Sequence, residues 1–173
     1  MMKVSFRYFI PALLLSVFFS LCSTPTLSQT IAVKRDTLPA FHLQLTDSSF
    51  YISNQPTSQR FIVLIYFSPD CGHCIDLTEE LIGKADSISN TLILMAAYKP
   101  LDELRAFSQR FLLNRFPFIR LGQDISYAIV PYYRIAYTPL VALYGPDRQL
   151  VGFWRSPEQP FRLQEFLQII QTK

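Results

Sequence analysis

The stretch FIVLIYFSPDCGHC, residues 61–74, decides the fold. Its first half, Phe61 to Phe67, shows no alternation of apolar and polar residues and is rich in β-branched and aromatic side chains, which is typical of a central strand covered on both faces. From Cys74 onward, leucine, alanine and isoleucine recur at helical spacing as far as Ile88, which predicts an amphipathic helix. The two cysteines therefore lie where a buried strand passes into a helix.

This position suits dithiol chemistry. Free backbone N–H groups and the positive end of the helix dipole stabilise a thiolate at a helix start, so we expect Cys71 to be the nucleophile. Cys74 follows almost one turn later, where it can attack a mixed disulfide held at Cys71, so we expect it to be the resolving thiol. The pair itself, as a redox-active disulfide, is the only cofactor expected. No metal site is expected, because zinc normally takes four ligands and only His42 is an obvious further candidate.

Three neighbours are expected to tune the redox chemistry of the pair. His73, together with Gly72, separates the cysteines, and a charged imidazole there would stabilise the reduced form and make the couple more oxidising. Asp70 directly precedes the nucleophile. Two interpretations of Asp70 stay open: its charge opposes thiolate formation, or its carboxylate caps the helix.

The first 28 residues are interpreted as a signal peptide. Lys3 and Arg7 form a positive segment, Phe9 to Leu21 is apolar but short for a membrane span, and small residues precede a cleavage point after Ser28. Residues 29–36 then form a tether, and residues 37–173 form one domain. We expect an exported protein, with an uncleaved N-terminal anchor or lipidation at Cys22 as the alternatives that would place it on a membrane.

Removal of this leader leaves Cys71 and Cys74 as the only cysteines of the mature chain. Closing so short a loop removes little entropy from the unfolded chain, so the pair is expected to react rather than to staple the fold. The leader also holds two of the 16 basic residues and no acidic one, which leaves 14 against 13. This near-neutral balance, without a basic run, excludes nucleic acid as an expected partner.

Further elements follow from hydrophobic periodicity and turn residues. Alternating positions around a Thr-Asp-Ser-Ser turn predict an N-terminal β-hairpin, and a second hairpin is predicted near the C-terminus around Gly-Pro-Asp-Arg. Helices are predicted from Pro100, where proline and acids suit the first turn, and near the C-terminus. The expected segments are hairpin strands within 38–45 and at 50–52, strands 91–98 and 116–121, a short helix within 125–133 interrupted by Pro131, hairpin strands 140–144 and 149–154, and a helix over 161–171.

The motif Cys-Gly-His-Cys between strand and helix, together with Tyr137-Thr138-Pro139-Leu140 before the last hairpin, resembles the thioredoxin superfamily. The 68 positions between Cys71 and Pro139 leave room for an inserted helix and strand within 100–121. With Leu38-Pro39-Ala40-Phe41 near the start, the chain is similar to the exported TlpA/ResA-like redoxins, which are grouped with the alkyl hydroperoxide reductase and thiol-specific antioxidant proteins.

This resemblance implies an α/β thioredoxin fold: a central mixed β-sheet with helices on both faces, an N-terminal β-hairpin extension and an inserted helix–strand unit. It implies that Pro139 is cis and faces the cysteines, and that the backbone of Thr138 pairs with the substrate chain. It also implies an exported, periplasmic thiol-disulfide oxidoreductase whose partners are protein thiols or disulfides and a redox partner protein.

The chain departs from the family pattern around the cysteines. Asp70 stands where a tryptophan is common, Ile65 where minimal thioredoxins have a buried acid, and Leu77 and Thr78 where TlpA/ResA-like members carry glutamate and proline. Proton transfer to and from Cys74 therefore needs another group, for which the candidates are Asp76 and Glu79.

Two other functions stay open. The first is a peroxiredoxin-like peroxidase, although Leu64 occupies the place of an expected proline. The second is a redox-inactive binding module with the same fold. The tyrosines at 132 and 133, with Trp154, are expected to pack the core or its rim, and an apolar substrate groove near Tyr132 and Tyr133 is the alternative.

Overall fold

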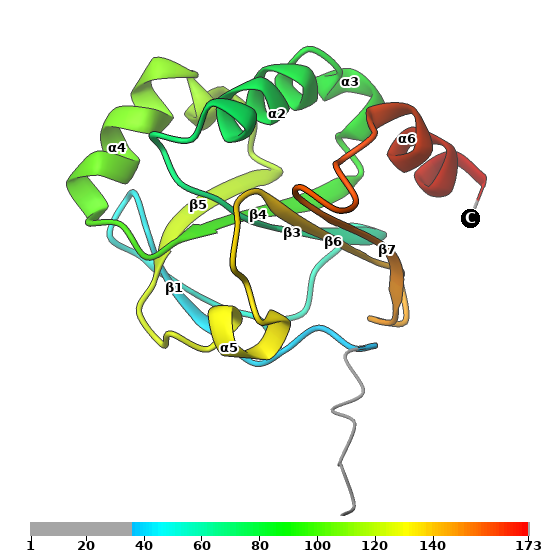
Figure 1. The fold of residues 1–173 in the computed structure, drawn as a ribbon, viewed down its shortest axis with the longest axis horizontal. Helices are drawn as coiled ribbons and strands as arrows, with labels where there is room; N and C mark the ends of the chain where they lie inside the picture. Colours follow the sequence, from blue (N-terminus) through cyan, green and yellow to red (C-terminus); the bar gives the residue numbers. More distant parts are fainter. Residues whose placement is uncertain (1–35, 173) are drawn as a thin grey trace, which may run out of the picture. The chain divides into compact units, whose positions relative to one another are not determined.

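The computed structural model describes residues 36–172 (Figure 1). The predicted signal peptide, Cys22 and nearly all of the predicted tether lie outside the described residues. Within the described part, no helix has the length and apolar character required to cross a membrane.

A seven-stranded mixed sheet forms the centre of the domain, in the order β2-β1-β5-β4-β3-β6-β7. Strands β3, β4 and β5 run parallel to one another, and the remaining neighbours are antiparallel. The strands are β1 (His42–Leu45), β2 (Phe50–Ile52), β3 (Phe61–Tyr66), β4 (Thr91–Ala97), β5 (Ile119–Asp124), β6 (Leu140–Tyr144) and β7 (Leu150–Arg155). This is the predicted fold class, including both hairpins.

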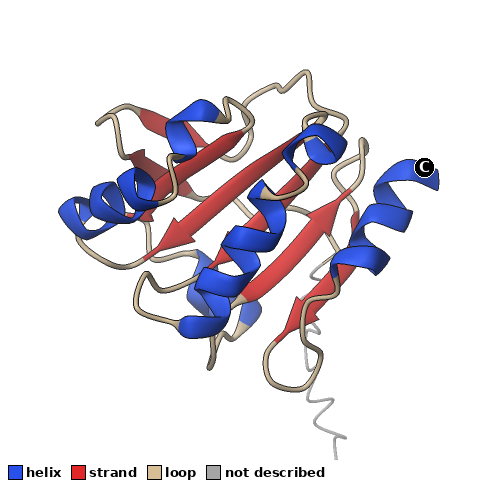
Figure 2. Ribbon diagram, turned by 90° about the horizontal axis from the view of Figure 1, so that it is seen from above, coloured by secondary structure: helices blue, strands red, loops and turns tan. Residues whose placement is uncertain are grey.

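Helices cover the two faces of the sheet unequally. Figures 1 and 2 show α2 (Gly72–Ile82), α3 (Ala85–Ile88), α4 (Leu101–Arg110) and α6 (Leu163–Thr172) on one face. The short helix α5 (Ile129–Tyr133) lies on the other face, and a 3₁₀ turn, η1 (Leu113–Arg115), follows α4. The inserted helix–strand unit is confirmed as α4 and β5.

Strand β3 is buried at all six positions, as its uninterrupted apolar sequence predicts. Val63 and Ile65 belong to the core beneath α2, α4 and α6, whereas Ile62, Leu64 and Tyr66 belong to the core beneath α5. Because successive side chains of a strand point to opposite faces, β3 contributes to both cores and fixes the position of the loop that follows it. That loop carries the cysteines.

Three predictions about these elements were wrong: two boundaries and one interruption. The helix after Cys74 does not continue to Ile88: α2 ends at Ile82, Gly83 follows, and a separate turn, α3, completes the segment. Strand β5 lies at Ile119–Asp124 rather than 116–121, because Phe116 and Phe118 pack as loop residues against the core before the strand begins. Pro131 does not interrupt α5, since it occupies the first turn, where its missing N–H has no intrahelical partner to lose.

Candidate active site

The first cysteine caps the helix that follows β3. Cys71 is the residue before α2, in an extended conformation, and its carbonyl accepts hydrogen bonds from the N–H groups of Cys74 and Ile75 at 3.0 and 3.1 Å. Its own side chain is partly exposed, and both cysteines are free thiols. A partly exposed sulfur at a helix N-terminus is the position that favours a reactive thiolate.

The second cysteine is enclosed. Cys74 is 1% exposed and lies in the core beneath α2, α4 and α6. Burial raises the pKa of its thiol to about 12, and a hydrogen bond with the Cys71 side chain acts in the same direction. A client molecule can therefore reach the first sulfur but not the second, which is the asymmetry that a nucleophile and a resolving thiol require.

The loop before β6 meets the cysteines from the opposite side. The peptide bond between Thr138 and Pro139 is cis, and the Cys71 thiol donates a hydrogen bond to the Thr138 carbonyl at 3.6 Å. Tertiary packing thus brings together two motifs that lie 67 positions apart. The predicted pairing of the Thr138 backbone with a substrate chain stays a prediction.

Asp70 does not cap the helix, so that interpretation was wrong. Cys71 occupies the cap position, and the Asp70 carboxylate instead accepts hydrogen bonds from the Ser68 hydroxyl and from Lys99 Nζ at 3.2 Å. These two donors, the Ser68 hydroxyl first, hold the pKa of the Asp70 carboxyl below its usual range. Lys99 also lies 3.8 Å from Glu103. The negative charge beside Cys71 is therefore paired with a lysine that the sequence analysis did not identify.

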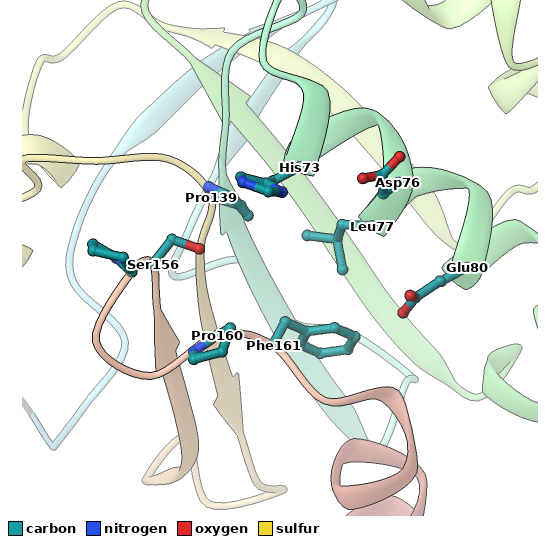
Figure 3. Close-up of a pocket in the computed structure, with 9 residues that line it drawn as sticks. His73, Asp76, Leu77, Glu80, Pro139, Ser156, Pro160 and Phe161 are labelled. Carbon is teal, nitrogen blue, oxygen red and sulfur yellow. The ribbon is translucent and has the colours of Figure 1, made fainter.

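His73 and Gly72 are both exposed on the first turn of α2. His73 lines a pocket of about 350 Å³ with Pro139, Ser156, Phe161 and two carboxylates of α2 (Figure 3). Within residues 36–172 no hydrogen bond joins His73 to either sulfur. A β-carbon at Gly72 would meet no atom within 4 Å, so this position has no steric requirement for glycine.

A larger groove includes Cys71 in its lining. We call it the tyrosine groove; its volume is about 880 Å³. It contains the predicted site residues Asp70, Cys71 and Thr138 together with tyrosines from four separate segments. Its lining is Tyr66, Ser68, Asp70, Cys71, Tyr98, Tyr127, Val130, Pro131, Ile135, Ala136, Tyr137 and Thr138.

Tyr132 and Tyr133 do not line this groove, although Val130 and Pro131 of the same helix do, and a substrate groove near them stays a prediction. Tyr132 instead donates its hydroxyl hydrogen bond to the Thr37 carbonyl at 2.8 Å, and Tyr133 is buried with its hydroxyl against that of Tyr144. Trp154, 1% exposed, packs in the core as expected.

The departures from the family pattern leave Cys74 without a neighbouring acid. Ile65 and Leu77 are buried apolar residues, whereas Asp76 and Glu79 are exposed on α2 and do not contribute to the pKa shift of Cys74. Within the described residues, no cluster of three histidine, cysteine or acidic side chains could hold a metal ion.

Solved structures identify the fold. The chain superposes with a TM-score of 0.63 on a secreted disulfide oxidoreductase of Mycobacterium tuberculosis homologous to E. coli DsbE, at 16% identity, covering 77% of this chain and 96% of the other. A peroxiredoxin-like protein from Aquifex aeolicus gives a TM-score of 0.65 at 13% identity, with coverages of 79% and 85%. A thiol-disulfide oxidoreductase from Bacteroides fragilis gives 0.62 at 14% identity, with coverages of 78% and 98%. The chain therefore has the thioredoxin fold.

Sequence similarity is more limited. Over 116 residues, the chain is 26% identical to protein disulfide isomerase-like 1-1 of Arabidopsis thaliana, a match that covers 65% of this chain and 22% of that protein. No family model matches the chain.

Proposed function

We propose that this thioredoxin-fold chain is an exported thiol-disulfide oxidoreductase that exchanges disulfides with protein thiols through Cys71 and Cys74. The observation that carries the proposal is the asymmetric pair at the start of α2. Cys71 is partly exposed and within 3.6 Å of the Thr138 carbonyl, while Cys74 is 1% exposed. The similarity to disulfide oxidoreductases and to a protein disulfide isomerase-like protein supports the same chemistry.

In the reducing direction, the Cys71 thiolate attacks one sulfur of a client disulfide. A bond forms between Cys71 and that sulfur, and the client's other sulfur leaves as a thiolate, which takes up a proton. Cys74 then attacks the Cys71 sulfur, which forms the Cys71–Cys74 disulfide, and the second client sulfur leaves as a thiol with the proton that Cys74 gives up. Two electrons pass to the client, and a dithiol of a redox partner protein restores the reduced pair.

The oxidising direction is the reverse of these steps. Which direction dominates depends on the potential of the pair relative to that of its partners. We propose Thr138 and Pro139 as the substrate-binding loop and His73 as a residue that makes the pair more oxidising when its imidazole is charged. Export follows from the predicted signal peptide, and the bacterial periplasm is the proposed compartment.

Trapping of mixed disulfides tests the proposal. Cys74→Ser should accumulate clients bound through Cys71, because the attack that releases them is lost, whereas the matched variant Cys71→Ser should trap none. Bound clients are detected on non-reducing gels and disappear with dithiothreitol. An equal amount of reducible adduct on both variants, or none on either, would contradict the proposal. Peroxide consumption by the purified protein without a thiol client would instead support the peroxidase.

A further inference from the structure

The chain between α4 and the end of β5 carries positive charge that its own sequence does not balance. Between Glu103 and Asp124 there are four arginines, at every fifth position, and no acidic residue. The domain as a whole is not basic, because all 13 acidic residues of the chain lie within residues 36–172, whereas several of its 16 basic residues do not. The excess of positive charge is therefore local.

The fold gathers these arginines at one corner of the domain. Arg105 of α4 donates from Nε to the Thr46 carbonyl and from a terminal nitrogen to the Ser48 hydroxyl, both at 2.9 Å, which joins α4 to the turn between β1 and β2. Arg105 and Arg120 line two adjoining hollows that share residues of this turn, of α4 and of η1. We call this surface the basic corner; it consists of Arg105, Arg110, Leu112, Arg115 and Arg120.

Three of the four guanidinium groups have no anionic partner within the domain. Arg110, Arg115 and Arg120 are exposed, and among the ion pairs and side-chain hydrogen bonds of residues 36–172 none involves them. The one carboxylate that lines the two hollows belongs to Asp47, and it already accepts two hydrogen bonds from Ser49. The basic corner therefore offers its charge to an anion from outside the domain.

An exposed leucine lies in the middle of the basic corner. Leu112 has a φ of 51°, in the left-handed region that favours glycine, and its side chain is 51% exposed. The Arg115 N–H donates to the Leu112 carbonyl at 3.0 Å, so a tight turn holds this leucine between Arg110 and Arg115. In the free protein neither burial nor backbone conformation favours leucine here over glycine or asparagine. Its side chain therefore indicates a contact outside the domain.

The combination of arginines and one leucine distinguishes between two kinds of anionic partner. Guanidinium groups bind phosphates through paired hydrogen bonds. A protein partner requires a contiguous apolar patch at the core of the interface, but among residues 104–121 Leu112 is the one large apolar side chain that is exposed. An isolated apolar side chain among cations is typical of proteins that lie on anionic membranes, where the cations contact headgroups and the apolar group inserts shallowly. The observations thus favour a lipid surface.

The direction of the strands fixes where the cysteines lie relative to the basic corner. Strands β3, β4 and β5 are parallel. Cys71 follows the end of β3, whereas Arg120 lies at the start of β5. The cysteines and the basic corner are therefore at opposite ends of the parallel strands, and a surface bound at this corner leaves Cys71 facing away from it.

We infer that the basic corner docks the domain on an anionic phospholipid surface: the arginines contact headgroup phosphates, Leu112 inserts among the headgroups, and Cys71 faces the solvent. This docking goes beyond the proposed disulfide exchange and does not depend on it. It would keep the cysteines near a membrane whether or not the N-terminus provides an anchor.

The test measures sedimentation of the purified exported protein with vesicles. The vesicles contain phosphatidylcholine alone or phosphatidylcholine and phosphatidylglycerol in a ratio of about two to one. Any binding through a retained leader appears with both vesicle types and is the same in every variant. We expect the anionic vesicles to bind the protein more than about tenfold more strongly than the uncharged ones, and added salt to remove the difference, because exposed charges are screened.

Two changes in the basic corner test its residues. Arg110→Gln with Arg115→Gln should weaken binding to anionic vesicles by about fivefold for each arginine, the factor to which about 1 kcal/mol corresponds. The matched control is Arg134→Gln with Arg162→Gln, which removes the same charge from two exposed positions outside the corner and should leave binding within about twofold.

Leu112→Asn separates docking from folding. Asparagine tolerates the left-handed conformation, so the melting temperature should stay the same or rise. Binding to anionic vesicles should nevertheless weaken by about threefold or more, because the inserted side chain is lost. A lower melting temperature with unchanged binding would show that Leu112 serves the fold, which would overturn its assigned role.

The remaining outcomes decide the partner and the orientation. Equal binding to both vesicle types, or an equal loss in the control variant, would overturn the inference. If the protein ignores vesicles but is retained on immobilised polyglutamate, and the variant at Arg110 and Arg115 is not, the partner is an acidic polypeptide and the lipid assignment is wrong. Alkylation of Cys71 by a membrane-impermeant maleimide should be as fast on vesicles as in solution, and protection of Cys71 would contradict the orientation.

Discussion

Because Cys74 is buried, the pH dependence of its alkylation should differ from that of an ordinary exposed thiol. Replacing Cys71 by alanine leaves Cys74 as the only thiol of the folded domain and removes the hydrogen bond between the two side chains. Burial, the largest cause of the raised pKa, remains. The rate at which iodoacetamide alkylates Cys74 in this variant should therefore follow a strongly raised pKa.

The expected size of the effect comes from the shift itself. The pKa of Cys74 rises from 9.0 to about 12, which lowers the thiolate fraction at neutral pH by about a thousandfold, because each unit of pKa corresponds to a factor of ten. The alkylation rate should accordingly climb about tenfold per pH unit from pH 7 to pH 10 without levelling off. The shape of this profile is the readout, because poor access to a buried sulfur lowers the rate at every pH.

The same variant unfolded in urea is the control, and its profile should level off near the ordinary thiol pKa. A folded protein whose profile also levels off near pH 9 would refute the argument from burial. The sign of the linked stability effect is fixed as well. The pKa of Cys74 is higher in the folded protein than in the unfolded chain. The protonated thiol therefore contributes its full share to the unfolding free energy below pH 9. This share is lost as the pH rises from 9 towards 12, so the unfolding free energy should fall over that range.

Three further substitutions test other parts of the structure. Gly122→Ala would place a β-carbon 2.7 Å from a backbone oxygen of β1, and should cost about 1–3 kcal/mol of unfolding free energy in urea titration; no loss would mean that β1 can move away. Trp154→Phe removes a fully buried indole whose Nε1 donates to a carboxylate of α6 at 3.2 Å, and should cost about 1–3 kcal/mol, read as a lower thermal midpoint. Lys99→Met leaves the charge of Asp70 without its cation beside Cys71, and should slow alkylation of Cys71 near pH 7. The effect should be less than about fivefold, since solvent screens an exposed pair. Adding Asp70→Asn should restore the rate, and a rate that is not restored would exclude a charge effect.

Much of the fold could be predicted because local sequence and tertiary structure agree. Phe61 to Phe67 carries no polar residue to break the strand, and β3 is buried on both faces. The break after Ile82 was missed because Ile88 still falls at helical spacing and is buried, although the backbone has turned at Gly83 and Lys84. Periodicity reports which side chains face the core, and it does not report whether the helix between them is continuous.

Strand β5 illustrates a different limit. Its sequence includes Arg120, Gly122 and Gln123, so apolar content favoured the preceding Phe116 and Phe118 instead. Hydrogen bonds from β1 and β4 on either side define the strand, and Gly122 allows β1 to approach closely. Neighbouring strands supply this information, which a single segment does not contain.

The candidate site could be predicted only where its residues lie close together in the sequence. Cys71 and Cys74 are recognisable because strand, loop and helix follow one another in the chain. The ion pair between Asp70 and Lys99 joins residues 29 positions apart, and the tyrosine groove collects side chains from the ends of β3 and β4 and from both sides of α5. Only the completed sheet brings these groups together.

The central claim is that Cys71 and Cys74 interconvert between a dithiol and a disulfide, and a redox titration tests it most directly. The protein is equilibrated with dithiothreitol or glutathione buffers of known potential, and free thiols are counted by alkylation and mass. We expect both thiols to be lost together in one two-electron transition, at a potential between those of thioredoxin, about −270 mV, and DsbA, about −120 mV. Thiols that stay free under oxidising buffers, or that are lost separately as glutathione adducts, would contradict the account.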